Sequence, residues 1–306
     1  MSTPDALMLG DQLGPRGRRR VWMATAVAAV VLLVVLVVAL RRLQSHDQLE
    51  WERWEPFTQW EVQRFLLLGL VNTLKAAALA MGFALVLGAA LALLRLSQTA
   101  PLRWLAAAFV EFFRGVPLIL LILFSYIGLR AQGIDISAFR ALVLALAVYN
   151  GAVLGEVFRA GIRSLDRGQT EAAYAIGLSY WQAMLLVVIP QAARRMVPAI
   201  VSQMVTLLKD TSLGFVIVYD ELLRRGRNTG QFFRNPLQAF VVVAVVYIIV
   251  NFALSRLAVR LEVRQRRRLG ADAIVVTGVD DLLGVGVAGA GEVGYGSGVG
   301  GGASSG

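Results

Sequence analysis

Long apolar runs divide the chain into six segments, each long enough to cross a bilayer. A hydrocarbon core of about 30 Å needs about 20 apolar residues in an α-helix, because each residue advances the helix by about 1.5 Å. The runs that meet this length cover residues 22–40, 66–94, 102–129, 139–162, 196–218 and 237–259. The pattern therefore predicts an all-α integral membrane protein with six transmembrane helices.

The first apolar run follows a basic segment, as the hydrophobic part of a signal peptide does. Its length exceeds the ~7–15 residues of such a region, and Arg41 and Arg42 stand where a small-residue cleavage site would lie. We therefore expect an extra N-terminal transmembrane helix at residues 22–40.

Charge at the two ends of the chain predicts the orientation. An even number of spans returns both termini to one side, and both flanks are basic, "RGRRR" before the first span and "RLEVRQRRR" after the sixth. Basic flanks face the cytoplasm, so we expect both termini, and the loop at residues 163–195, to be cytoplasmic. The arginine-rich "ELLRRGRNTGQFFRNP" then falls outside, and we interpret it as an interfacial helix.

The predicted organisation follows from these assignments, with three tryptophans (Trp51, Trp54 and Trp60) marking an interfacial helix on the outer leaflet. Its parts are a cytoplasmic basic N-terminus (1–21), the extra transmembrane helix (22–40), an extracytoplasmic interfacial segment (41–65), a five-helix core (66–259) and a basic, then glycine-rich, disordered cytoplasmic tail (260–306).

Composition supports a membrane location and excludes several kinds of function. Hydrophobic residues make up 57% of the chain and charged residues 16%, and the mean hydropathy is +0.66. The net charge of +10 could indicate a nucleic-acid partner, but the arginines gather at the ends of apolar runs, where they anchor spans in the lipid bilayer. We expect no nucleic-acid partner.

The chain has few residues that could serve in catalysis or bind a metal ion. It has no cysteine, and its one histidine, His46, lies in a polar segment without a second ligand, so no metal site is expected. Neither lysine follows a phosphate-binding glycine loop. We expect a chain that is not an enzyme, has no catalytic residues, binds no cofactor and does not itself hydrolyse ATP.

The stretch "DRGQTEAAYAIGLSYWQ" predicts an amphipathic helix at residues 166–182. Asp166 with Gln169 has the spacing of a capping box, and Thr170 with Glu171 offers a second cap. Four residues separate Ala173 from Gly177, so on a continuous helix they form a notch without bulk, flanked by Ile176, Leu178 and Trp181. Such a helix can insert into a partner's groove or lie on the inner leaflet, and periodicity alone leaves both open.

Motif spacing adds a resemblance that covers about residues 65–259. Its motifs are Glu171, Ala172, Ala173 and Gly177, then Ile189, Pro190, Gln191 and Ala192, then "KDTSL" from Lys209, with "FVEFFRGVPL" from Phe109 and "YNGAVLGEVFRAGI" from Tyr149 upstream. In this order and on membrane segments, the set resembles permease subunits of bacterial ATP-binding-cassette importers in the polar amino-acid branch. It looks most like the glutamate or glutamine permeases of actinobacteria.

This resemblance implies a type I importer fold in the bacterial plasma membrane and a division of labour among subunits. A cytoplasmic ATPase homodimer uses ATP and accepts the coupling residues Glu171, Ala172, Ala173 and Gly177. A second permease subunit, with a heterodimer favoured, completes the pathway, and an extracellular binding protein delivers the amino acid. Tyr149 and Asn150 fall among the residues expected in the pathway or its gates.

Charged residues inside the spans are costly and therefore mark candidate sites. Glu111 with Arg114, and Glu156 with Arg159, have the spacing of ion pairs. Both pairs lie toward the cytoplasmic ends, where they either fix packing between spans or form an inner gate. Pro117 and Pro198 should interrupt the hydrogen bonds of their helices and favour bends.

Lys209 and Asp210 lie near the middle of the fifth predicted span and are followed by two hydroxyl residues. This composition predicts a broken helix in which Thr211 or Ser212 caps a new segment. Lys209 suits either a structural or gating role or a contact with a substrate carboxylate, and we favour the first.

Two other classes remain open at this level. A secondary transporter would need no ATPase and should show inverted repeats, of which we find no convincing example. A membrane-anchored scaffold would not need charges within its spans.

Overall fold

The computed structural model describes residues 14–256 and residue 260. Every regular element in this part of the chain is a helix, so the all-α prediction is confirmed. The first 13 residues, most of the second basic segment and the predicted glycine-rich tail lie outside the described residues.

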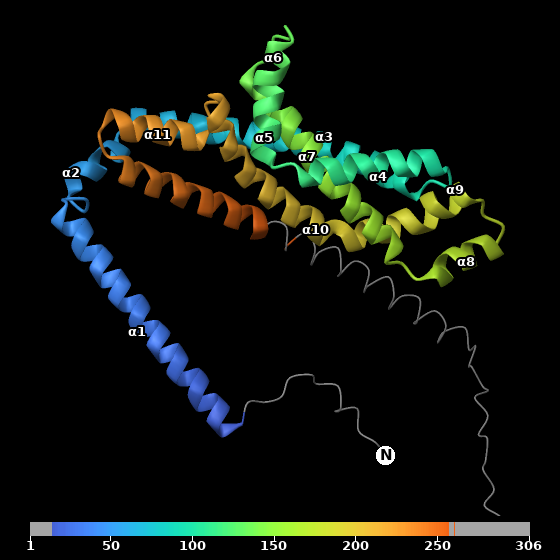
Figure 1. Ribbon diagram of the computed structural model, residues 1–306, viewed down its shortest axis with the longest axis horizontal. Coiled ribbons are helices and arrows are strands. Elements are labelled where there is room, and N and C mark those ends of the chain that lie inside the picture. Colours follow the sequence, from blue (N-terminus) through green and yellow to red (C-terminus); the bar gives the residue numbers. More distant parts are fainter. Residues whose placement is uncertain (1–13, 257–259, 261–306) are drawn as a thin grey trace, which may run out of the picture. The chain divides into compact units, whose positions relative to one another are not determined.

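The helices follow one another as labelled in Figure 1. They are α1 (Pro15–Ser45), α2 (Trp51–Trp54), η2 (Glu55–Thr58), α3 (Trp60–Leu96), α4 (Ala100–Gly115), α5 (Leu118–Leu123), η3 (Phe124–Gly128), α6 (Leu129–Ala131), α7 (Ala138–Arg163), α8 (Arg167–Ala175), α9 (Tyr180–Ala183), η4 (Met184–Val188), α10 (Ile189–Asp210), η5 (Thr211–Ile217), α11 (Leu222–Phe232) and a final helix at Pro236–Arg256. Of these, η3 and η4 are π-helical, and η2 and η5 are 3₁₀ helices.

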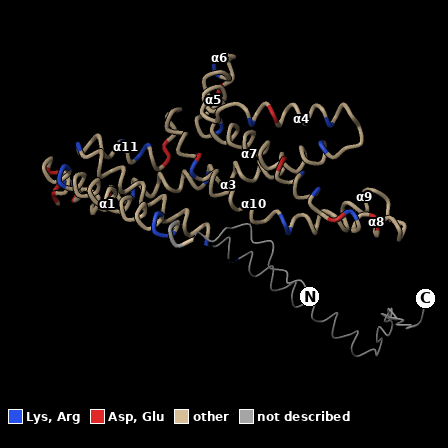
Figure 2. Tube along the Cα trace, turned by 60° about the horizontal axis from the view of Figure 1, so that its bottom comes forward, with Lys and Arg blue, Asp and Glu red and all other residues tan. Residues whose placement is uncertain are grey.

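Five of the described helices are long and apolar enough to span a bilayer. They are α1, α3, α7, the continuous run Tyr180–Ile217 and the final helix. The bent pair of α4 with α5–α6 makes a sixth if it is one broken span rather than a re-entrant loop. In Figure 2 the charged positions gather mainly near the ends of the long helices, and most positions between them are tan. Charge therefore concentrates where helices meet the polar regions of a membrane.

The core forms where α3 lies along α7. The contact is made by small residues: Gly88 of α3 faces Gly151 and Gly155 of α7, and a Cβ atom at Gly88 would lie 2.8 Å from the Cβ of Leu154. Ala76, Ala80 and Ala84 continue the buried face of α3. Small side chains let two backbones approach closely, which is how helices associate when lipid surrounds them.

The predicted third span is not one straight helix. It divides at Val116 and Pro117 into α4 and α5–α6, which are bent by 100°, and Figure 1 shows α5 and α6 projecting away from α4. Pro117 lacks a backbone N–H and disfavours helical geometry in the residue before it, and Val116 accordingly has φ −81° and ψ 131°. The predicted bend at Pro117 is confirmed, and it divides the span predicted at 102–129 into a bent pair of helices.

The fifth span is longer than predicted and has no break at its middle. Helix continues from Tyr180 to Ile217 and passes through Pro198. Thr211 does not cap a new segment, because its hydroxyl donates a 2.7 Å hydrogen bond back to the carbonyl of Leu208 and the helix only tightens to 3₁₀ geometry. The break comes later, at Val218, where φ is +64°.

We expect the α3–α7 contact to be sensitive to a single added side chain. Gly88→Val should lower the free energy of unfolding by about 1–3 kcal/mol, because overpacking a close contact forces its neighbours apart. The measurement is the melting temperature of the detergent-solubilised chain.

Gly82→Val is the matched control, since Gly82 also lies on α3 but has nothing within 4 Å of an added Cβ. Equal melting temperatures for the two variants would show that the glycine contact does not hold the core.

Candidate functional site: a coupling loop and polar contacts along the spans

The loop between α7 and the Tyr180–Ile217 span contains two short helices rather than one. Asp166 caps α8 as predicted, accepting a hydrogen bond from the backbone N–H of Gly168 at 2.9 Å. The helix then ends at Gly177, whose φ is +87°. The N–H of Gly177 donates to the Tyr174 carbonyl (2.9 Å) and that of Leu178 to the Ala173 carbonyl (3.2 Å). These two bonds form a Schellman motif, a common helix end.

The predicted continuous helix at 166–182 is therefore wrong. Gly177 was predicted to be a small residue on a helix face, whereas its left-handed backbone conformation ends the helix. Thr170 and Glu171 lie inside α8 and form no second cap. The capping box instead belongs to α9, where Ser179 and Gln182 satisfy each other's backbone groups.

The predicted notch between Ala173 and Gly177 does not form. Ala173 is only 3% exposed and packs against its own chain, and a side chain at Gly177 would be strained by its φ whatever lay opposite. Glu171 and Ala172 are exposed on α8. The loop presents to solvent an apolar surface instead, which is made by three side chains, Tyr174, Ile176 and Trp181, with Ile176 78% exposed.

Side-chain hydrogen bonds hold the residues around α8 to the Tyr180–Ile217 span. The Gln191 amide donates to the Gln169 side chain at 3.0 Å, which links α10 to α8. Arg195 of α10 donates to the carbonyl of Ser164 at 2.8 Å. Gln191 was predicted only as part of a motif, and no role was predicted for Arg195. These two bonds attach α8, and the segment just before it, to one helix, α10.

A cluster of charges joins α3 to α7. Glu156 forms ion pairs with Arg159 of its own helix and with Arg95 near the end of α3. The Glu156–Arg159 pair was predicted, whereas Arg95 was missed because its position was not counted among the charges within spans. Glu111 and Arg114 form no ion pair within the described residues and both are exposed on α4. Spacing of three permits such a pair without requiring it.

A buried hydrogen bond links α7 to α10 deeper in the protein. Asn150 is fully buried; its amide donates to the Leu146 carbonyl (2.8 Å) and its oxygen accepts from Gln203 (2.6 Å). Tyr149 beside it is half-buried. Asn150 was a predicted pathway residue, and its partner Gln203 was not.

Lys209 and Ser212 lie at a cavity, whereas Thr211 between them is buried in the core. Lys209 and Ser212 line a cavity of about 260 Å³ together with Tyr247 and apolar residues of the final helix. Thr211 is buried and Asp210 half-buried. The structure thus brings Lys209 and Ser212 to one cavity without the predicted helix break.

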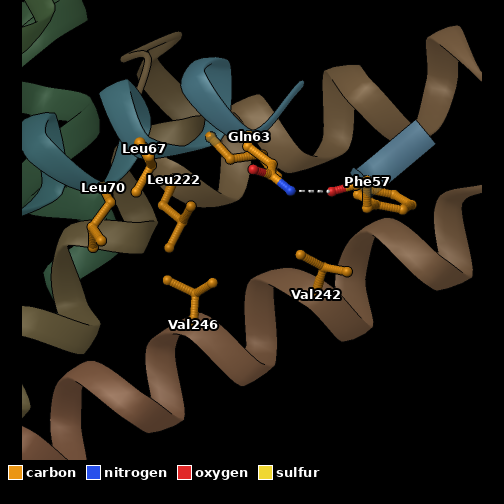
Figure 3. A pocket seen from close by; sticks show the side chains of 8 residues that line it. Phe57, Gln63, Leu67, Leu70, Leu222, Val242 and Val246 are labelled. Carbon is orange, nitrogen blue, oxygen red and sulfur yellow. Dashed lines mark hydrogen bonds between the residues drawn. The ribbon is translucent and has the colours of Figure 1, made fainter. Parts of the chain in front are cut away.

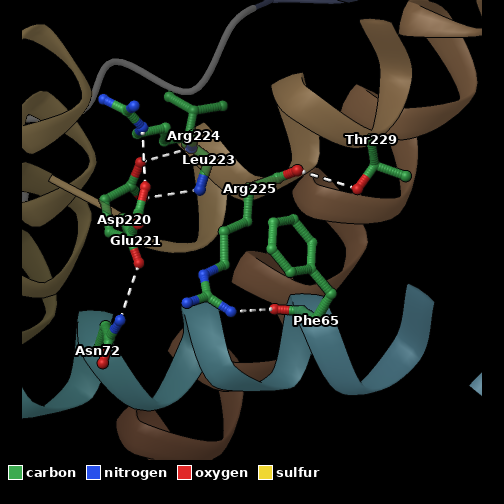
Figure 4. A network of polar contacts seen from close by, with 8 residues as sticks. All are labelled: Phe65, Asn72, Asp220, Glu221, Leu223, Arg224, Arg225 and Thr229. Atoms are coloured by element: carbon green, nitrogen blue, oxygen red, sulfur yellow. Dashed lines mark hydrogen bonds and ion pairs between the residues drawn. The ribbon is translucent and has the colours of Figure 1, made fainter. Parts of the chain in front are cut away.

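The η5–α11 junction, residues 218–225, holds a buried carboxylate that was not among the predicted site residues. Glu221 is 0% exposed, caps α11 by accepting from the N–H groups of Leu223 (2.7 Å) and Arg224 (2.6 Å), and accepts from the Tyr247 hydroxyl (3.1 Å). Figure 4 shows the bonds of Glu221 to Leu223 and Arg224 with the neighbouring Asp220–Arg224 ion pair. Burial raises the pKa of Glu221 from its usual 4.5 to about 7.

The η5–α11 junction also fixes the N-terminal half of α3. Asn72 donates to the carbonyl of Asp220 at 2.9 Å, and Arg225 donates to the carbonyl of Phe65 at 3.0 Å, as Figure 4 shows. Thr73 accepts from the N–H of Leu222. The end of one span is thereby held against another.

Spanning helices with a structured loop between two of them define a multi-pass membrane protein. The chain matches the family described as binding-protein-dependent transport system inner membrane component over residues 84–267. It belongs to this family, the permease subunits of ABC importers, and is therefore a cell-membrane transport subunit. The family depends on a substrate-binding protein and on an ATPase.

Individual relatives agree with this assignment. The chain is 42% identical to the glutamate transport system permease protein GluD of Corynebacterium glutamicum, over 74% of this chain and 84% of GluD. It is 40% identical to the probable glutamine ABC transporter permease protein GlnP of Bacillus subtilis, over 66% and 94%. A solved amino acid ABC transporter with histidines matches with a TM-score of 0.64 and 32% identity, over 67% of this chain and 95% of that one. The type I importer fold is confirmed.

Glu221 predicts a dependence of stability on pH. Because its pKa is about 7 in the folded chain and 4.5 ordinarily, folding takes up a proton between these values. The free energy of unfolding should then fall by about 1–3 kcal/mol as pH rises from 4.5 to 7 and beyond. Glu221→Gln removes this contribution, so the melting temperature of the wild type relative to the variant should decrease between pH 5 and pH 8.

Glu61→Gln serves as the control, since Glu61 is an exposed carboxylate at the start of α3. It should keep the wild-type slope. A wild-type minus Glu221→Gln difference that stays constant with pH would contradict the assignment.

Proposed function

We propose that this chain forms the translocation pathway for a polar amino acid, glutamate or glutamine favoured, in an ATP-driven bacterial uptake system. The observation that carries the substrate class is the 42% identity to a glutamate permease over most of both chains. Another polar amino acid is the alternative. A secondary transporter is not supported, because the family depends on binding proteins.

Other subunits complete the system in this proposal. A separate ATPase homodimer binds and hydrolyses ATP, this chain holds no cofactor or metal of its own, and an extracellular binding protein delivers the amino acid. A second permease subunit, as a heterodimer, forms the other half of the pathway. Both termini lie in the cytoplasm, so that the loop at 163–195 faces the ATPase.

The coupling step uses the attachment of α8 to one long helix. The apolar surface of Tyr174, Ile176 and Trp181 contacts the ATPase, with Glu171 and Ala172 beside it on α8. Displacement of α8 pulls on α10 through the Gln169–Gln191 and Arg195–Ser164 bonds. Because helix continues from Tyr180 to Ile217, that motion reaches the outer end of the same span.

The polar groups along that span have roles in the pathway or its gates. Gln203 meets Asn150 of α7, and Lys209 and Ser212 line the cavity beside the final helix. At the inner end Glu156 and Arg159 fix α7 to α3 through Arg95. Five further residues are proposed for the pathway or its gates on the strength of their motifs: Glu111, Arg114, Pro117, Tyr149 and Asp210.

A charge placed on the apolar surface of the loop should separate the chain from its ATPase. Ile176→Glu should lower the amount of ATPase that co-purifies by about tenfold or more, because burying an unpaired carboxylate costs more than the 1.4 kcal/mol that a factor of ten represents. Phe232→Glu is the control: Phe232 is also an exposed apolar residue, on α11 at the opposite end of the span. Equal retention by both variants would exclude this surface as the coupling contact.

Uptake in cells with and without this chain, competed by unlabelled amino acids, tests the substrate proposal. Competition by glutamate or glutamine is expected, and uptake that does not depend on the chain would refute the function. Lys209→Ala should lower the rate at least tenfold while leaving the order of competitors unchanged, since a gating residue does not choose the substrate. Lys75→Ala, the change at the chain's other lysine, should leave the rate near wild type. A shift toward cationic competitors would make Lys209 a selector.

A further inference from the structure

Helix α1 has no packing partner within the described part of the chain. None of its most apolar 18-residue window is buried, and its mean hydropathy, 3.0, is the highest among the spanning helices. A helix with such a surface is stable only inside a bilayer, yet the bilayer alone does not fix where it lies. Three observations limit its position: the attachment of its outer end, the depth of the membrane and an open groove in the core.

Buried hydrogen bonds attach the outer end of α1 to the final helix. Gln238, 0% exposed, donates its amide to the carbonyl of Gln48 at 2.6 Å, and Asn235 donates to the carbonyl of Arg53 at 2.8 Å. Gln48 follows α1 by three residues, and Gln238 lies in the first turn of the final helix. The two helices therefore enter the membrane from neighbouring points.

Membrane depth limits how far the two helices can then separate. Both must cross a hydrocarbon core of about 30 Å, and spans tilt by about 20° on average. A relative tilt of that size separates two helices by about 10 Å after 30 Å, which is about the diameter of one helix. At that relative tilt, α1 and the final helix would stay within about one helix diameter of each other across the membrane.

The final helix has a stripe of exposed apolar side chains. Its members are spaced by three or four residues and so share one face; they are Leu237, Val241, Val245 and Ile248. Ile248 is 66% exposed. Beside the stripe lies a groove of about 240 Å³ between α3 and the final helix.

Apolar side chains line the groove almost entirely. Figure 3 shows Leu67 and Leu70 of α3 and Val242 and Val246 of the final helix around it, with Phe57 at the end nearest the attachment. Gln63 is the one polar residue among the described residues of the lining, and its amide nitrogen donates to the carbonyl of Phe57 at 3.1 Å. The groove therefore suits an apolar helix surface.

We infer that α1 packs antiparallel along the stripe of its own final helix and closes this groove. The attachment fixes the register, with Ser45 level with Gln238. Because the helices are antiparallel, a residue of α1 lies level with the residue of the final helix whose number, added to its own, gives about 283. Ile248 then lies near Val35.

Cysteine cross-linking tests this register directly, because the chain has no cysteine of its own. Ile248→Cys is combined, one variant at a time, with cysteine at each position from 27 to 37, and the membranes are oxidised. The expected result is a cross-link within one chain whose yield peaks near Val35 and recurs about every 3.6 residues. Asn235→Ala with Gln238→Ala should lower the yield at the peak.

Leu144→Cys, scanned against the same positions, is the matched control. Leu144 is also an exposed leucine in an apolar groove, which lies between α3 and α7 and has a volume of about 620 Å³. Cross-links to Leu144→Cys would place α1 in that other groove. Cross-links of Ile248→Cys that double the mass, or that join the chain to another subunit, would assign α1 to a neighbour. Absence of any cross-link, with all cysteines reactive to maleimide, would also overturn the inference.

Discussion

The glycine contact between α3 and α7 is the constraint on which the other interactions depend. In a bilayer the hydrophobic effect does not favour contact between apolar helices, so close van der Waals packing must hold them together. Gly88, Gly151 and Gly155 allow that approach. Once the two helices are fixed, Arg95 near the C-terminal end of α3 meets Glu156 of α7. The N-terminal half of α3 is equally placed to receive the junction around Glu221.

The Asn150–Gln203 bond joins the Tyr180–Ile217 span to α7 in midhelix, and the Tyr180 hydroxyl donates to the Leu96 carbonyl of α3 at 3.5 Å. A hydrogen bond between spanning helices contributes only about 0.6–2 kcal/mol. It can therefore fix register without locking the span against movement. Further polar contacts lie at its two ends, where the loop at residues 163–195 and the η5–α11 junction attach. This distribution suits a helix that moves as a unit between two anchored ends.

The fold class was predictable because the apolar runs are long and the bilayer sets their length. Local backbone geometry was predictable where one residue decides it, as at Pro117 and Asp166. Gly177 misled the prediction because glycine has two meanings, a small helical surface or a left-handed helix end, and only the hydrogen bonds to Tyr174 and Ala173 distinguish them.

Contacts between distant segments were the hardest part of the site to predict. The pairs Arg95 with Glu156, and Gln203 with Asn150, join residues 61 and 53 positions apart. Local spacing cannot find such pairs, and it favoured Glu111 with Arg114 instead. Glu221 was missed because a single glutamate before a helix is an ordinary cap in sequence, and its burial depends on Tyr247 and α3.

The Schellman end at Gly177 and the capping box at Ser179 also bear on the thermodynamics of association. Both are made from the chain's own backbone and side-chain groups, so the turn between α8 and α9 is already ordered before any subunit docks on it. Binding to a preformed surface avoids the cost of about 1–2 kcal/mol for each residue that would otherwise have to be ordered. Association at this loop should therefore proceed without a coupled folding step, and its temperature dependence should carry only the small heat-capacity change of a rigid interface.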